Sequence, residues 1–206
     1  MYVVMITGGI GSGKSAVRRL LCEHGAASVD LDEIARVLLQ TREPMRAELV
    51  DEFGTKILDE DGNVDRAALA AAAFATAEAT QAMNAITFPY ITTEAAKYLV
   101  GPCCVPTTKA PVVAVEVPLL TEVPEFATIA DEVIAVEAPS EVRLARCVAR
   151  GMDAYDVLQR MQQQPTDAAR RVVATTICTN AGTEDELAAW VDEWWHERED
   201  AGVFGA

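Results

Sequence analysis

A glycine-rich segment early in the chain has the residue types and spacing that bind phosphate. Residues 8–15 read Gly-Gly-Ile-Gly-Ser-Gly-Lys-Ser and match G-x-x-x-x-G-K-S/T. Such glycines let backbone N–H groups fold around a polyphosphate, and a helix N-terminus adds positive potential. Lys14 is expected to bridge the β- and γ-phosphates, and the Ser15 hydroxyl to bind Mg²⁺. The predicted ATP-binding residues here are Gly9, Gly11, Ser12, Gly13, Lys14, Ser15 and Ala16.

Carboxylates stand at two predicted strand ends, where ligands bind in open α/β sheets. Asp30 and Asp32 lie at the C-terminal end of the second predicted strand, and Asp32 could also cap the helix that starts at Glu33. Glu116 ends the most apolar strand. Its carboxylate could hold Mg²⁺ through water or simply face solvent.

Positive charge is concentrated in one segment of an acidic chain. The formal net charge is −15, yet residues 143–171 hold six arginines against three aspartates. Arg143, Arg146 and Arg150 share one helical face, and arginine forks suit bidentate binding of phosphate. Gly151 would then act as a hinge for a mobile lid. The alternative is a solvated cationic helix face.

Short apolar runs alternate with helical spacing along the chain. Strands are predicted at residues 2–6, 26–31, 112–117, 133–136 and 176–178. Helices are predicted at 15–24, 33–40, 44–53, 66–79, 82–99, 140–150 with Ser140 as N-cap, 153–164 and 184–198. This alternation predicts a parallel sheet covered on both faces. Three tryptophans, Trp190, Trp194 and Trp195, are expected to pack the last helix, although a subunit contact is the alternative.

Composition excludes several classes of protein. The 206 residues are 50% apolar, enough for one domain with a core. The acidic balance disfavours nucleic-acid binding, and no apolar run approaches the roughly 20 residues that span a bilayer. The N-terminus does not read as a signal peptide. Five cysteines without C-x-x-C spacing read as reduced, buried fillers. We therefore expect a cytoplasmic protein that binds neither nucleic acid nor membrane; no oligomeric state is predicted.

Taken together, these segments resemble the dephospho-coenzyme A kinase family over almost the whole chain. Residues 7–15 are similar to its opening motif almost letter for letter, and residues 29–36 to its acidic acceptor motif. The other similar segments are 61–66 with Leu69 (D-G-x-L/V-D-R), 116–120 (D-x-P-L-L), 146–171 with Gln164 (the lid and the segment after it), and Asn180 with Gly182 (the N-x-G loop near the adenine of ATP).

The resemblance implies a P-loop three-layer α/β/α fold with a five-stranded parallel sheet, a helical substrate-binding insertion and a helical lid. Within a single domain, the core would be residues 1–30, 110–140 and 172–206, the acceptor-binding region 31–109 and the lid 141–171. The implied reaction is Mg²⁺- and ATP-dependent phosphorylation of the 3′-hydroxyl of dephospho-coenzyme A, giving coenzyme A and ADP, the last step of coenzyme A synthesis.

The resemblance also assigns roles to residues. The implied catalytic residues are Lys14, Asp32 and Arg146; ATP contacts extend to Arg143 and Asn180; acceptor contacts are Asp32, Arg36, Phe88 and Pro89; the Mg²⁺ ligands are Ser15 and, through water, Glu116.

Three positions depart from the family pattern. Phe88 precedes Pro89 where the family usually has His-Pro, Glu116 replaces aspartate, and residues 175–176 are Thr-Thr in place of Ala-Asp. Two alternatives therefore stay open: a nucleoside or deoxynucleoside monophosphate kinase of the same fold, and a non-enzymatic nucleotide-dependent switch.

Overall fold

A computed structural model describes residues 1–29, 31–100, 110–118, 120–122 and 124–204. The chain forms two compact units, one comprising Met1–Val29 with Pro102–Ala206 and the other Asp30–Gly101. None of the described helices is long and apolar enough to cross a membrane.

The first unit is built on a five-stranded parallel sheet of order β2-β3-β1-β4-β5. Its strands are β1 (Tyr2–Gly8), β2 (Ala27–Val29), β3 (Val112–Glu116), β4 (Glu132–Glu137) and β5 (Thr176–Thr179). Most residues of β1, β3 and β4 are buried, as expected for strands covered on both faces. The register pairs Ile6 with Glu116 and Gly8 with Val136. The carboxyl ends of these strands therefore meet at one edge of the sheet.

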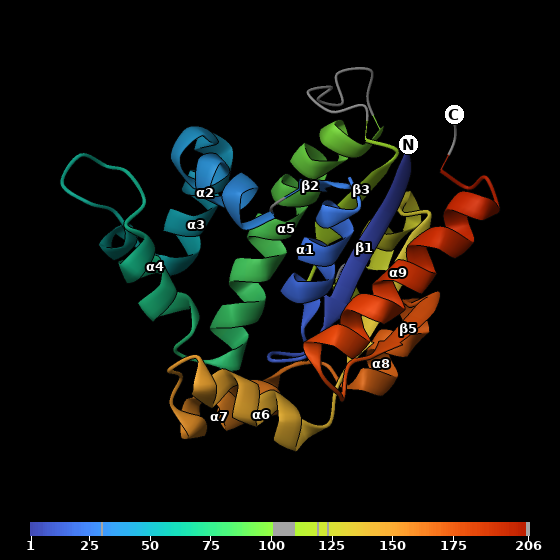
Figure 1. Ribbon diagram of the computed structural model, residues 1–206. Coiled ribbons are helices and arrows are strands. Elements are labelled where there is room, and N and C mark those ends of the chain that lie inside the picture. The colour runs from blue at the N-terminus through green and yellow to red at the C-terminus, as the bar shows by residue number, and fades with distance from the viewer. Residues whose placement is uncertain (30, 101–109, 119, 123, 205–206) are drawn as a thin grey trace. The chain divides into compact units, whose positions relative to one another are not determined.

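Helices cover both faces of this sheet (Figure 1). Helices α1 (Lys14–Glu23) and α9 (Glu184–Asp200) share one apolar core with the strands, which includes Leu21, Val191, Trp194 and Trp195. This confirms the packing interpretation of Trp194 and Trp195. On the other face α8 (Asp167–Val173) contacts β1 and β4. The five-stranded three-layer fold is confirmed.

The structure corrects several sequence predictions. The helix predicted at 66–79 ends at Ala73, and the next helix begins at Ala77. Helix α8 was not predicted, because its seven residues contain only two helical turns and no clear apolar period. Helix α6 (Ser140–Ala149) has Pro139 as its N-cap, and Ser140 is its first helical residue. Proline fits this cap position because its carbonyl still accepts the first helical bond, here from Arg143 N at 3.0 Å. Strand β2 ends at Val29, and α2 begins two residues before Glu33, so Asp32 lies inside that helix and is not its cap.

The first unit also contains helix α7 (Ala154–Gln163), which packs on α6, and two 3₁₀ helices, η2 (Leu120–Glu122) and η3 (Pro124–Ile129). The Asp153 side chain caps α7 by accepting from the backbone N–H groups of Tyr155 and Asp156. The thiols of Cys22, Cys147 and Cys178 are free, and the latter two are buried as expected. The predictions for Cys103 and Cys104 lie outside the described residues.

The second unit is helical. It contains α2 (Leu31–Thr41), α3 (Glu43–Phe53), the 3₁₀ turn η1 (Thr55–Ile57), α4 (Arg66–Ala73) and α5 (Ala77–Val100). Its core includes Leu38, Met45 and Leu49. Pro89 lies inside α5, and the hydroxyls of Thr92 and Thr93 donate to the carbonyls around it.

Candidate active site at the phosphate loop

The glycine-rich segment connects β1 to α1 as predicted. Gly13 precedes α1 with a left-handed φ of 104°, and α1 has no side-chain cap. A β-carbon at Gly13 would also collide with the Asn180 amide, so both conformation and space require glycine. An uncapped helix N-terminus behind a glycine loop is a site suited to phosphate.

Lys14 lies at the first turn of α1, and its Nζ donates to Gly9 O at 3.2 Å. Burial lowers the pKa of Lys14, nearby Glu116 raises it, and Arg170 and Arg143 lower it again, leaving it below its ordinary value. A half-buried ammonium group with like-charged neighbours is stabilised by an anion. The position therefore favours a bound phosphate.

Ser15 and Glu116 lie together although they are far apart in sequence. The Ser15 hydroxyl donates to Glu116 Oε1 at 3.1 Å, and Arg18 Nε lies 3.5 Å from the Glu116 carboxylate. Among the described residues, no group of three His, Cys, Asp or Glu side chains could form a metal site by itself. Mg²⁺ commonly takes one or two protein oxygens beside substrate phosphates and water. The hydroxyl and carboxylate oxygens present fit that ion.

The arginines of α6 contact two different loops. Arg143 is buried, its Nε donates to Ile10 O at 2.8 Å, and its guanidinium occupies the space where Gly9 would have a β-carbon. Arg146 donates to Asn180 O at 3.0 Å, Asn180 Oδ1 at 3.2 Å and Gly182 O at 3.1 Å. The alternative interpretation of these arginines as a solvated cationic helix face is therefore wrong for Arg143 and Arg146.

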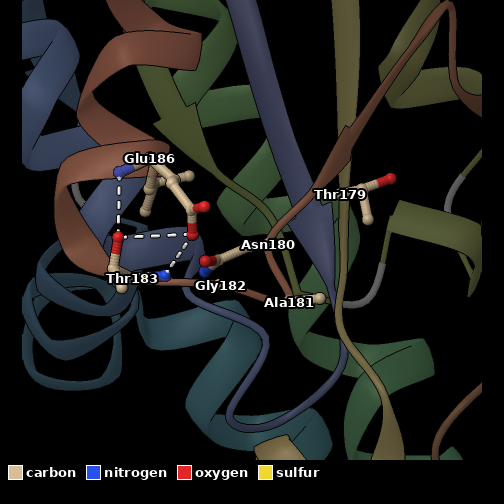
Figure 2. A pocket seen from close by; sticks show the side chains of 7 residues that line it. Thr179, Asn180, Ala181, Gly182, Thr183 and Glu186 are labelled. Atoms are coloured by element: carbon tan, nitrogen blue, oxygen red, sulfur yellow. Dashed lines mark hydrogen bonds between the residues drawn. The ribbon is translucent and has the colours of Figure 1, made fainter.

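A cavity of about 420 Å³ lies beside the loop after β5 (Figure 2). It is lined by Thr179, Asn180, Ala181, Gly182, Thr183, Glu186 and Leu187. The Thr183 hydroxyl accepts from Glu186 N, and the Glu186 carboxylate accepts from Thr183 N at 2.7 Å, which forms the capping box of α9. Asn180 is buried, and its Nδ2 donates to Ser12 O at 2.8 Å. Asn180 thus joins this cavity to the phosphate loop.

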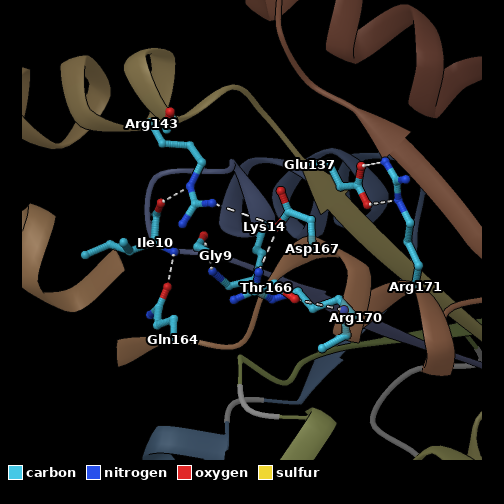
Figure 3. Close-up of polar contacts among 12 residues, drawn as sticks. Gly9, Ile10, Lys14, Glu137, Arg143, Gln164, Thr166, Asp167, Arg170 and Arg171 are labelled. Carbon is cyan, nitrogen blue, oxygen red and sulfur yellow. Dashed lines mark hydrogen bonds and ion pairs between the residues drawn. The ribbon is translucent and has the colours of Figure 1, made fainter. Parts of the chain in front are cut away.

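Asp167 and Arg170 lie beside the phosphate loop and were not selected as site residues from the sequence. Figure 3 shows Asp167 and Arg170 from α8 beside Lys14 and Arg143. The Arg170 Nη1 donates to Asp167 Oδ1 at 2.8 Å. The only signal in the sequence was the spacing of three residues between an aspartate and an arginine, which is typical of an ion pair on one helical face. It could not show that this pair faces the loop rather than solvent.

The predicted acceptor residues belong to the second unit. Asp32 lies in the first turn of α2, and its side chain lies outside the described residues, as does Asp30 entirely. Arg36 forms an exposed ion pair with Glu33. Phe88 and Pro89 lie within α5. The residues brought together around the phosphate loop are therefore those of the first unit.

A phosphate loop between the central strand of a parallel sheet and its helix, with an arginine from a later helix bonded to that loop, defines a P-loop nucleotide-binding protein of the kinase type. A model of the family described as dephospho-CoA kinase matches residues 2–186. The chain belongs to the dephospho-CoA kinase family.

Similar proteins agree with this assignment. A dephospho-CoA kinase of Frankia casuarinae is 39% identical over 96% of this chain and 83% of its own length. One from Corynebacterium jeikeium is 40% identical over 95% of this chain and 98% of its own. Among solved structures, TT1252 from Thermus thermophilus has a TM-score of 0.73 at 31% identity, covering 95% of this chain and 97% of that one. Dephospho-CoA kinase from Campylobacter jejuni has a TM-score of 0.69 at 21% identity, covers 97% of this chain and 98% of that one, and shows the fold alone.

Proposed function

We propose that this protein transfers the terminal phosphoryl group of ATP to the ribose 3′-hydroxyl of dephospho-coenzyme A, giving coenzyme A and ADP. The observation that carries this proposal is the phosphate loop with its half-buried Lys14, in a chain that the family model matches over residues 2–186. Transfer of this kind requires positioning and charge stabilisation more than covalent chemistry by the protein.

The phosphate loop binds the donor. The N-terminus of α1 and the Lys14 ammonium would bind the β- and γ-phosphates, and the Arg143 guanidinium, which lies beside Gly9, would add a further positive charge. These donors are held in place before the reaction by the bonds to Gly9 O and Ile10 O. Fixed donors stabilise charge that moves during transfer without a reorganisation cost.

Ser15 and Glu116 are proposed to hold Mg²⁺, the former through its hydroxyl and the latter through water. When bound, Mg²⁺ would neutralise phosphate charge. The short distance between Ser15 Oγ and Glu116 Oε1 supports this pairing.

The nucleotide base is proposed to occupy the cavity after β5. Asn180 bonds both to Ser12 and to Arg146, so it holds the cavity loop and the phosphate loop in one arrangement. Arg146 is also proposed as a catalytic residue, and it would belong to the lid formed by residues 141–171. Its three bonds to Asn180 and Gly182 support, in addition, a role in fixing the base-binding loop.

The acceptor side is proposed from the family pattern. Asp32 would orient or deprotonate the acceptor hydroxyl, and Arg36, Phe88 and Pro89 would contact the acceptor. Residues 31–109 would then be the acceptor-binding region, and residues 1–30, 110–140 and 172–206 the core. The helical second unit supports a separate binding role for this part of the chain.

Acceptor-dependent ADP release tests the proposal. Purified protein is supplied with Mg²⁺ and ATP, and with dephospho-coenzyme A, a panel of deoxynucleoside monophosphates, or no acceptor. We expect ADP release with dephospho-coenzyme A only, and coenzyme A as the second product. Preference for a monophosphate would identify a sister kinase, and equal release without acceptor would exclude a kinase.

Lys14→Ala is the matched loss-of-function variant for that assay. It should abolish transfer because the charge that follows the transferred phosphate is lost. Lys56→Ala, at an exposed lysine in η1, serves as the control. A Lys14→Ala variant that keeps more than about a tenth of the activity would contradict the role derived from the motif.

A further inference from the structure

Arg170 is an arginine buried beside the phosphate loop. Its exposed fraction is 1%, and its Nε has no hydrogen-bond partner among the described residues. Burial lowers the pKa of Arg170, Asp167 raises it and Arg143 lowers it, with a net decrease. A buried guanidinium carries a desolvation cost that its environment must offset.

The counter-ion of Arg170 is shared. Asp167 Oδ1 accepts from Arg170 Nη1 at 2.8 Å and lies 3.9 Å from Arg143 Nη1. Arg143 in turn donates to Ile10 O in the phosphate loop at 2.8 Å. Two guanidinium groups therefore meet one carboxylate, and Figure 3 shows Lys14 beside them. The cluster holds more positive than negative charge.

The next residue of α8 shows a different arrangement. Arg171 has a side chain 61% exposed and pairs with both oxygens of Glu137, at 2.7 and 2.6 Å. Its charge is therefore matched by the Glu137 carboxylate through two hydrogen bonds, whereas Arg170 has one such bond to a carboxylate that Arg143 also approaches. Arg170 and Arg171 thus form a natural pair of test and control on one helix.

We propose that Arg170 is a positioning residue for the terminal phosphate of a bound nucleoside triphosphate. It holds the Asp167 carboxylate, and Asp167 holds the Arg143 guanidinium over Gly9, where the terminal phosphate would meet it. The proposal rests on nucleotide binding at the phosphate loop as stated above. The excess positive charge is balanced by a triphosphate and less completely by a diphosphate, which lacks the γ-phosphate.

Nucleotide affinity measured by calorimetry tests this role. The ligands are ADP and the non-hydrolysable triphosphate adenosine 5′-(β,γ-imido)triphosphate, each with Mg²⁺. Arg170→Met should weaken triphosphate binding about tenfold, or 1.4 kcal/mol, and ADP binding less than about twofold, while Arg171→Met leaves the ratio of the two affinities unchanged. Equal losses for both nucleotides would overturn the proposal, because a purely structural arginine would not discriminate between them.

A double-mutant comparison tests whether Arg170 acts through Arg143. If Arg170 acts through Arg143, the variant with both Arg143→Met and Arg170→Met should bind the triphosphate within about twofold of Arg143→Met alone. Fully additive losses would overturn that route. Where thermal melts show that Arg170→Met does not fold, Arg170→Lys replaces it. That variant keeps the charge but loses the fork, so about a threefold loss confined to the triphosphate is expected, and unchanged affinities would overturn the proposal.

These measurements use no acceptor. Wild-type protein that binds the triphosphate selectively but releases no ADP with dephospho-coenzyme A would overturn the proposed reaction and leave the role of Arg170 standing. Wild-type protein that binds neither nucleotide would overturn both.

Discussion

Glu132 should be a main determinant of stability, because it neutralises an arginine in the interior of the first unit. Its carboxylate accepts from Arg198 Nε and Nη2, both at 2.7 Å, and from Trp194 Nε1 and the Tyr2 hydroxyl, both at 2.9 Å. The Thr176 hydroxyl is a further donor. Only 5% of the Glu132 side chain is exposed. The network joins β1, β4, β5 and α9.

Replacing this carboxylate would leave a positive charge without its partner. We expect Glu132→Gln to lower the free energy of unfolding by about 3 to 5 kcal/mol, the usual range for one partner of a buried ion pair. For a chain of this size that corresponds to a melting temperature lower by roughly 6 to 20 °C. Calorimetry or circular dichroism at neutral pH would measure the shift.

Glu197 provides the matched control, because it pairs with the same arginine at 3.6 Å from a side chain that is 67% exposed. Glu197→Gln should cost less than about 1 kcal/mol. Adding Arg198→Met to Glu132→Gln should recover part of the loss, since the unpaired charge is removed. Equal shifts for the two glutamine variants would refute the reasoning.

The same network predicts a pH dependence. Burial raises the pKa of Glu132, but hydrogen bonds from Arg198, Thr176, Trp194 and Tyr2 outweigh it and hold the pKa below its ordinary value. A depressed carboxyl pKa stabilises the fold above the unfolded-state value of about 4.3 and loses that effect as pH falls through the folded-state value. The stability difference between wild type and Glu132→Gln should therefore narrow in acid. A stability difference that stays constant at every acidic pH where both proteins still fold would contradict this assignment.

Three further predictions concern the site. Gly13→Ala should abolish nucleotide binding because its β-carbon meets Asn180, whereas Gly25→Ala, at the same φ of 104° with open space around it, should cost roughly 1 to 2 kcal/mol of stability and leave binding intact; loss of binding in both variants would remove the steric explanation. Asp32→Asn should slow single-turnover transfer roughly 100-fold while the protein stays folded and binds ATP, and near-normal transfer would exclude Asp32 as the catalytic carboxylate. Arg146→Ala should lower the turnover number more than it weakens ATP binding, as expected for a lid arginine; a change confined to the Michaelis constant for ATP would leave only its role in fixing the base-binding loop.

Local patterns were sufficient for much of the fold. The phosphate loop could be predicted because its motif is eight consecutive residues. Gly11 and Gly13 adopt positive φ angles, which glycine reaches without the strain that other residues would carry. The strands could be predicted because buried parallel strands are continuous apolar runs. Where local signals were weak, the prediction failed: α8 is only seven residues long, and the start of α6 depended on whether Pro139 or Ser140 takes the cap.

The partners of the polar side chains were decided only by the tertiary structure. The spacing of Arg143 and Arg146 placed them on one helical face, but one bonds to the loop after β1 and the other to the loop after β5. Asn180 reaches Ser12 across 168 positions of the chain. The burial of Arg170 depends on α8 packing against the sheet. The sequence determined which residues could bind phosphate, because that chemistry is local; which arginines surround the loop depends on strand order and helix packing, which join residues that no local pattern relates.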